Sequence, residues 1–229
     1  MTNIHDQKHG DFLLVNTRLL RLVMVPPDTP IPVVDMIVLP GSKATIADLG
    51  FIREQGWDID IIAHHRRGGA VLGICGGYQM LGRSIDDPLG IEGAAGRAEG
   101  VGLLDVQTVL TGDKRVSQVQ GRALYARFEG YEIHIGQTTG PDTTRTFAML
   151  GEGHADGAQS ADGTVMGTYC HGLLESGPLR RALLAKIDAP SHAQPHSDRG
   201  DAALEDIAAT LEEALDIDGL IALARENVI

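Results

Sequence analysis

The sequence has little cysteine, few aromatic residues and a deficit of positive charge. Two cysteines among 229 residues cannot build the multi-bridge framework of a small secreted domain, so reduced thiols are expected. With 31 acidic and 19 basic residues, the formal net charge is -12, and no basic stripe can neutralise the phosphates of a nucleic acid. No apolar run approaches the roughly 18 residues of a membrane-spanning helix, and the polar segment 1–10 is not a signal peptide. These absences predict an acidic, cytoplasmic globular protein without a nucleic-acid or membrane partner.

One stretch, residues 70–82 (AVLGICGGYQMLG), concentrates the chemistry of the chain. Its apolar start, 70–74, predicts a buried strand, and the segment 78–83 predicts a helix. Cys75 lies between them in the pattern G-x-C-G-G, which is typical of a nucleophile elbow, a tight strand-to-helix turn that lifts a reactive side chain above a sheet. The dipole of the helix would favour the thiolate. A buried structural cysteine is the alternative interpretation.

Apolar runs and turn residues along the rest of the chain predict an α/β fold. We expect an open, mostly parallel sheet with flanking helices and a helical C-terminal tail. Strands are predicted at residues 19–25, 33–39, 70–74, 102–110, 116–128, 131–136, 158–161 and 164–169, and helices at 45–55, 58–67, 78–83 and 179–187. Residues 111–114 are predicted to form a turn between neighbouring strands, and residues 86–100 a surface loop.

Composition divides the chain into three parts. Residues 1–17 form a poorly defined polar segment, residues 18–188 the α/β domain, and residues 189–229 a linker followed by an acidic tail. Apolar residues in the tail recur at helical spacing, which predicts an amphipathic helix. A solvated face accounts for most of its acidic residues, and a docking surface for a partner is the alternative.

Cys75 and His171 are the candidate nucleophile and base. Each follows a predicted strand, and they lie 96 positions apart, so only the fold can bring them together, as nucleophile–base pairs commonly require. His171 would keep Cys75 ionised and later protonate a leaving amine. A thiolate that attacks a carbonyl also needs donors for the oxyanion; the N–H of Gly76 and an amide of the Pro40-Gly41-Ser42 turn are the candidates.

Four ordered segments resemble a known family. They are LPGSK at 39–43, the elbow with Gln79 four residues after the cysteine, GYEIHIG at 130–136, and GTYCHG at 167–172. Together they resemble the class I glutamine amidotransferases, and more closely the C-terminal glutaminase domain of cobyric acid synthases, from about residue 18 to the end. The resemblance implies a flavodoxin-like, class I amidotransferase fold. It also implies a reaction in which glutamine-derived ammonia and ATP amidate carboxylates of the corrin ring in cobalamin synthesis.

The resemblance assigns roles to individual residues. It implies that Cys75 forms a glutamyl thioester and that His171 is its acid/base partner. It implies that Gly41 and Gly76 hold the oxyanion, and that Gln79 helps to bind the substrate glutamine.

Two further residues, Glu132 and His134, belong to a family segment that the resemblance places at the same site. A hydrogen-bonded polar pair on a strand is the alternative reading of both. The wider amidotransferase class carries a glutamate two residues after its histidine, and this chain has Leu173 there. A Cys–His dyad is therefore expected instead of a triad.

The resemblance also sets the expected partners and cofactors. Complete cobyric acid synthases carry an ATP-dependent synthetase domain with a phosphate-binding loop, but no G-x-x-x-x-G-K-[ST] motif occurs in this sequence. We therefore expect no metal and no cofactor in this chain, because ATP and Mg²⁺ would belong to a synthetase domain or subunit. That partner, the substrate glutamine and, through the partner, a corrin are the expected interactions.

Two alternatives stay open on the sequence. The chain could be the glutaminase subunit of an amidotransferase that acts on cell-wall lipid II, where the glutaminase is a separate polypeptide. It could also be a truncated, inactive domain that serves as a binding subunit, because residues 1–17 do not plainly supply the family's first strand, whose loss would expose a sheet edge. The sequence favours a cut-down or separately encoded glutaminase portion.

Overall fold

The computed structural model describes residues 21–189, except for the side chains of residues 113–115. The predicted N-terminal segment 1–17, most of the linker and the predicted tail helix lie outside these residues. The prediction of a strand at 19–25 is wrong over its described part: residues 21–25 are irregular, and Leu22 and Met24 are exposed. Without a neighbouring strand among residues 21–189, this apolar run has no ladder in which to bury its side chains.

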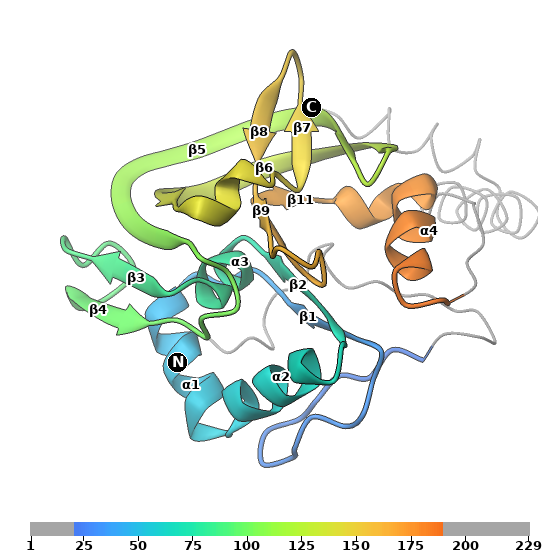
Figure 1. Ribbon diagram of the computed structural model, residues 1–229. Helices are drawn as coiled ribbons and strands as arrows, with labels where there is room; N and C mark the ends of the chain where they lie inside the picture. The colour runs from blue at the N-terminus through green and yellow to red at the C-terminus, as the bar shows by residue number, and fades with distance from the viewer. Residues whose placement is uncertain (1–20, 190–229) are drawn as a thin grey trace, which may run out of the picture. The chain divides into compact units, whose positions relative to one another are not determined.

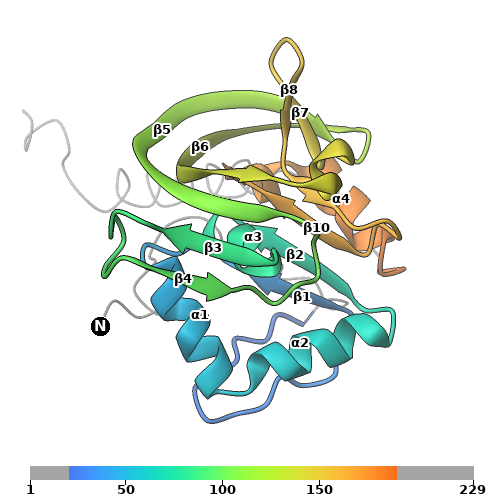
Figure 2. The same ribbon diagram turned by 60° about the vertical axis from the view of Figure 1, so that its left-hand side comes forward.

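A mostly parallel sheet of four strands forms the base of the site (Figures 1 and 2). Its order is β1-β2-β10-β9, and the strands are β1 (Met36–Leu39), β2 (Ala70–Ile74), β9 (Ala158–Gln159) and β10 (Val165–Thr168). β1, β2 and β10 run parallel, while β9 is antiparallel to β10. Every residue of β2 and β10 is buried, as expected for central strands covered on both faces. The carboxyl ends of β1, β2 and β10 therefore meet at one edge.

Helices flank this sheet and bury apolar side chains in the core, among them Leu49, Ile52 and Ile61. The helices are α1 (Thr45–Glu54), α2 (Trp57–Arg66) and the short α3 (Gly76–Leu81). Figure 2 shows α1 and α2 next to each other beneath β1 and β2. Gly68, with a φ of 84°, terminates α2 in the left-handed conformation that favours glycine. No helix among residues 21–189 is long and apolar enough to span a membrane.

A second, mainly antiparallel sheet lies over α3 (Figures 1 and 2). Its main path has the order β11-β6-β5-β3-β4, and β7 and β8 extend it from β5. The strands are β3 (Ser84–Asp87), β4 (Gly96–Glu99), β5 (Gln107–Ala123), β6 (Ala126–Thr139), β7 (Ala148–Leu150), β8 (His154–Asp156) and β11 (Cys170–His171). The short 3-10 helices η2 (Pro141–Thr144) and η3 (Leu173–Glu175) and the helix α4 (Gly177–Ala185) complete the described chain.

Three predictions in this region are wrong: the turn at 111–114, the unbroken strand at 116–128 and the surface loop at 86–100. β5 runs without a break through residues 111–114, where a turn was expected, and only its register to β6 shifts there. The chain reverses instead at Leu124 and Tyr125, which both have positive φ angles (49° and 64°). The expected surface loop 86–100 contains β4 and the end of β3, which pair as a hairpin. The predicted hairpin around Asp162-Gly163 is confirmed as β9 and β10.

One segment of chain belongs to both sheets. β10 pairs with β2 in the first sheet, and β11 pairs with β6 in the second, with Tyr169 alone between them. This strand switch, at residues 168–170, lies directly beside the end of β2. The backbone N–H of Cys75 donates to the carbonyl of Thr168 there at 2.8 Å. The sheet change therefore takes place at the predicted nucleophile.

Candidate active site

Cys75 occupies a strained turn between β2 and α3. Its φ of 52° and ψ of -111° lie in a region that side-chain-bearing residues rarely adopt, at a cost of about 1–3 kcal/mol. The first helical hydrogen bond follows at once, from the N–H of Gln79 to the carbonyl of Cys75 at 3.1 Å. This strand–turn–helix geometry is that of a nucleophile elbow. Both cysteines are free thiols, as expected.

The β1–α1 turn packs directly against the elbow. A Cβ added to Gly76 would lie 2.8 Å from the backbone nitrogen of Ser42, and one added to Gly77 would overlap the carbonyl of Leu39. The close approach therefore requires glycine. It brings the turn that contains the buried Gly41 next to Gly76. Their role as oxyanion donors stays a prediction.

His171 is delivered to the same sheet edge by the strand switch. His171 lies three residues after Thr168, whose carbonyl binds the backbone of Cys75. Three residues span at most about 10 Å, so His171 must lie near the nucleophile. On β11 it pairs with Tyr131 of β6, and the two rings are parallel at a centroid distance of 5.2 Å. The fold thus brings together two positions that are distant in the sequence.

The segment that carries Glu132 and His134 lies directly against the nucleophile. The thiol of Cys75 donates to the carbonyl of Ile133 at 3.3 Å. Glu132 is only 1% exposed, and its carboxylate lies 3.9 Å from Nε2 of His134. It also accepts a hydrogen bond from the hydroxyl of Ser117 at 3.4 Å. Both residues therefore lie beside the site, their approach to each other is also compatible with the alternative, and their contact with substrate stays a prediction.

Gln79 is buried and is held by protein groups. Its side-chain nitrogen donates to the carbonyl of Ile135 at 3.1 Å and to the hydroxyl of Tyr169 at 3.2 Å. Its side-chain oxygen accepts from the hydroxyl of Thr45 at 3.3 Å. These contacts tie α3 to α1, to β6 and to the strand switch. The contact with substrate glutamine stays a prediction.

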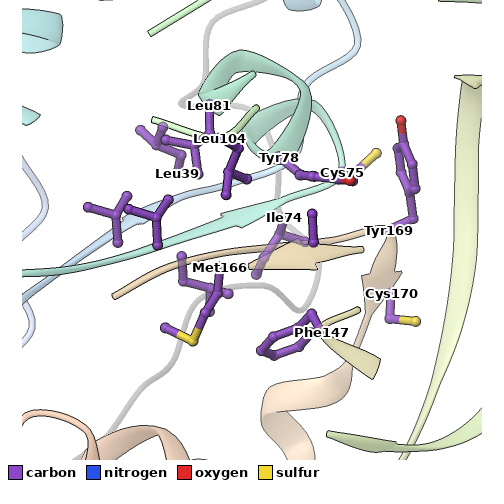
Figure 3. Close-up of a cluster of buried hydrophobic side chains, with 14 of the residues drawn as sticks. Leu39, Ile74, Cys75, Tyr78, Leu81, Leu104, Phe147, Met166, Tyr169 and Cys170 are labelled. Atoms are coloured by element: carbon purple, nitrogen blue, oxygen red, sulfur yellow. The ribbon is translucent and has the colours of Figure 1, made fainter. Parts of the chain in front are cut away.

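Tyr169 is a site residue that the sequence reasoning did not single out, although it lies inside GTYCHG. Its hydroxyl shares a hydrogen bond of 2.5 Å with Thr138, and its ring stacks on His134 at a centroid distance of 3.9 Å. Burial raises the pKa of its hydroxyl to about 12, and the nearby Cys75 adds to this shift. In Figure 3 the sulfur of Cys75 lies on the same side of the strands as the Tyr169 ring, whereas Cys170 lies on the opposite side.

The fold and the site together define a class of protein. A parallel sheet whose central strand ends in a cysteine elbow, beside a glycine turn and a histidine-bearing strand, is the arrangement expected of a class I glutamine amidotransferase. A solved structure described as "Crystal structure of glutamine amidotransferase" has a TM-score of 0.50 to this chain at 19% identity, and the match covers 67% of this chain and 79% of that one. The fold is that of the glutamine amidotransferases.

The family follows from sequence similarity. The family model for the CobB/CobQ-like glutamine amidotransferase domain matches residues 4–179, and the chain belongs to this family. Cobyric acid synthase of Novosphingobium aromaticivorans is 57% identical over 204 residues, which cover 89% of this chain and 42% of that protein. Cobyric acid synthase of Rhizorhabdus wittichii is 56% identical over 207 residues, which cover 90% of this chain and 43% of that protein. The chain thus spans less than half the length of these curated relatives.

Proposed function

We propose that this chain is the glutaminase part of a cobyric acid synthase. It would hydrolyse glutamine through a thioester on Cys75 and supply ammonia for the ATP-dependent amidation of corrin carboxylates. The observation that supports this best is the strained Cys75 turn, packed against the Gly41 turn and beside the strand that leads to His171. The high identity to cobyric acid synthases supports the corrin substrate over cell-wall lipid II.

The proposed chemistry is covalent catalysis in two steps. The thiolate of Cys75 attacks the side-chain amide carbon of glutamine, and the N–H groups of Gly41 and Gly76 stabilise the oxyanion. The carbon–nitrogen bond breaks as His171 gives a proton to the nitrogen, which leaves as ammonia. His171 then removes a proton from water, whose oxygen attacks the thioester carbon. Glutamate leaves, and the Cys75 thiolate and the protonated His171 are regenerated.

The ammonia has to be consumed by a second reaction. Amidation of a carboxylate requires activation of that carboxylate, which the proposal assigns to an ATP- and Mg²⁺-dependent synthetase domain or subunit. In this scheme the corrin is bound by the synthetase, and the present chain binds only glutamine. Gln79, Glu132 and His134 would border the bound glutamine.

Ammonia release from glutamine tests the proposal, measured on the purified chain alone and with a synthetase partner. We expect activity in the wild type, and a loss of about 10³-fold or more in Cys75→Ala because no thioester can form. Cys170→Ala is the matched control, because Cys170 is the other buried thiol of the described residues, and it should keep its activity. A wild type that is silent under both conditions would exclude the proposed function.

A further inference from the structure

A buried carboxylate outside the predicted site lies at the strand switch. Asp156, the last residue of β8, is 4% exposed. Its own backbone carbonyl accepts from the N–H of Phe147 at 3.0 Å and from the hydroxyl of Thr146 at 2.7 Å. These two hydrogen bonds fix the backbone of Asp156, and its buried side chain contacts the strand switch.

The carboxylate of Asp156 binds three consecutive residues of the switch segment. One oxygen accepts from the hydroxyl of Thr168 at 2.5 Å, and the other accepts from the backbone N–H of Tyr169 at 3.1 Å. The thiol of Cys170 donates to the first oxygen at 3.6 Å. The Thr168 hydroxyl in turn accepts from the N–H of Cys170 at 3.0 Å. One side chain thus binds the last residue of β10, Tyr169 and the first residue of β11.

The position of this contact gives it a consequence for the site. Tyr169 is the residue at which the chain leaves the first sheet and enters the second, so its N–H lies between the two ladders. A buried N–H must be satisfied, and Asp156 satisfies it. On one side of the contact, Thr168 binds the backbone of Cys75; on the other side, two residues on, is His171. The direction in which the chain leaves Tyr169 sets where His171 lies.

We propose that Asp156 is a positioning residue for the Cys75–His171 pair. It acts on the backbone that precedes the histidine, not on the imidazole, and it fixes the angle at the strand switch. The position two residues after His171, which holds a glutamate in the wider class, is Leu173 and is fully buried. This chain therefore has no carboxylate at position 173 to orient His171. Asp156 orients it instead, by fixing the backbone that leads to it. This inference rests on the proposed roles of Cys75 and His171.

The charges around Asp156 argue for a geometric role. Burial raises its pKa, and the buried Glu132 on β6 adds to the shift. Burial likewise raises the pKa of the Cys170 thiol beside it. A second negative charge close to Glu132 is unfavourable, and therefore what Asp156 contributes is its oxygen atoms as acceptors. An uncharged residue with an oxygen in the same place should therefore accept the Tyr169 N–H and fix the strand switch as well.

The pH dependence of Cys75 alkylation by iodoacetamide, read by peptide mass spectrometry on the full chain, tests this inference without requiring turnover. Because the proposal assigns activation of the thiol to His171, Cys75 of the wild type should be alkylated faster than Cys75 of His171→Ala. Asp156→Ala should raise the midpoint by about one pH unit, so that the alkylation rate at a pH below both midpoints falls about tenfold. Asp156→Asn keeps an oxygen for the Tyr169 N–H and should restore most of the wild-type profile.

Each outcome decides between alternatives. Equal shifts in Asp156→Ala and Asp156→Asn would show that the charge matters and would overturn the positioning role, as would no shift in either. Cys170→Ala, which removes only the longest contact, should match the wild type. If Asp156→Ala does not fold, Thr168→Val decides: a raised midpoint supports the role and an unchanged one overturns it. A wild type that is alkylated no faster than His171→Ala would instead exclude the proposed Cys75–His171 pair, and the inference with it.

Discussion

Individual side chains at the site combine strain with burial. Cys75 is held in a conformation that costs energy, and Glu132 and Asp156 are buried carboxylates. Such features persist only where their surroundings fix them, and here each has several hydrogen-bond or backbone contacts. Stability has been given up at these positions in return for a defined arrangement of polar groups, which is the usual character of a functional site.

The raised pKa of Asp156 predicts how stability should change with pH. A carboxyl whose pKa is higher in the folded state keeps its proton there while the unfolded chain, near its ordinary value of about 3.9, has already released it. The free energy of unfolding of the wild type therefore falls, through this group, as pH rises from about 4 toward the raised pKa. Asp156→Asn does not titrate and lacks this loss. Relative to the wild type, its free energy of unfolding should rise by about 1.4 kcal/mol for each pH unit between about 4 and the raised pKa.

Urea unfolding of both proteins between pH 4.5 and about 7.5 measures this difference. We expect the free energy of unfolding of Asp156→Asn, minus that of the wild type, to increase with pH. Cys170→Ala, in which the same carboxyl still titrates, should follow the wild-type pH dependence. Parallel curves for Asp156→Asn and the wild type would contradict the raised pKa.

Among individual residues, the sequence predicted those that lie in short local motifs. Cys75 and Gly76 lie in one short pattern, and His171 lies in another. Asp156 could not be found in this way, because its partners lie 12 to 14 positions further on and are brought to it by a change of sheet. A single aspartate before a glycine has no signal that distinguishes it from a turn residue.

Among the elements, the pairing of β6 with β11 is what holds the histidine. The two strands approach so closely at Gly130 that a Cβ there would overlap the carbonyl oxygen of His171. Any side chain at this position would force the two-residue strand β11 away from β6. The glycine is therefore a requirement of strand packing and not of turn formation.

Gly130→Ala should be destabilising and should also disturb the site. Overpacking of this kind costs about 1–3 kcal/mol, which urea unfolding would measure. The midpoint of Cys75 alkylation should rise as well, because His171 moves with β11. Gly112→Ala on β5 is the matched control, since an added Cβ there meets nothing within 4 Å, and it should leave both quantities nearly unchanged. A Gly130→Ala protein with wild-type stability would refute the close approach.

The elements of the first sheet were predictable, and those of the second were less so. β2 is an apolar run between glycines, and its predicted bounds are confirmed. In β5, by contrast, a sequence with turn composition is kept extended because its ladder to β6 resumes after a shift in register. The true reversal at Leu124 and Tyr125 uses two positive φ angles without glycine or asparagine, so the usual hairpin signal is missing there.

For the whole described domain, residues 21–189, one apolar core serves both sheets. The core residues include Val71, Leu72, Ile74, Tyr78, Leu81, Leu104, Val106, Phe147, Met166 and Leu173, and Figure 3 shows part of this cluster. Because the core is shared, the two sheets are expected to unfold in a single transition. The class of fold followed from the alternation of elements and from the resemblance. The existence of the second sheet did not, because long-range strand pairing is not encoded in local patterns.

The β7–β8 hairpin has a further consequence for chain connectivity. Its exposed tip, residues 151–153, separates a part of the chain that contains Cys75 from a part that contains His171. Two polypeptides, 1–151 and 152–229, should each lack the proposed glutaminase activity and should regain it when mixed, because β8, β10 and β11 of the second fragment pair with β7, β2 and β6 of the first. Ammonia release that depends on the concentration of both fragments would establish this complementation, whereas activity in either fragment alone would rule it out. The rate of ammonia release would then measure how much of the two fragments is associated.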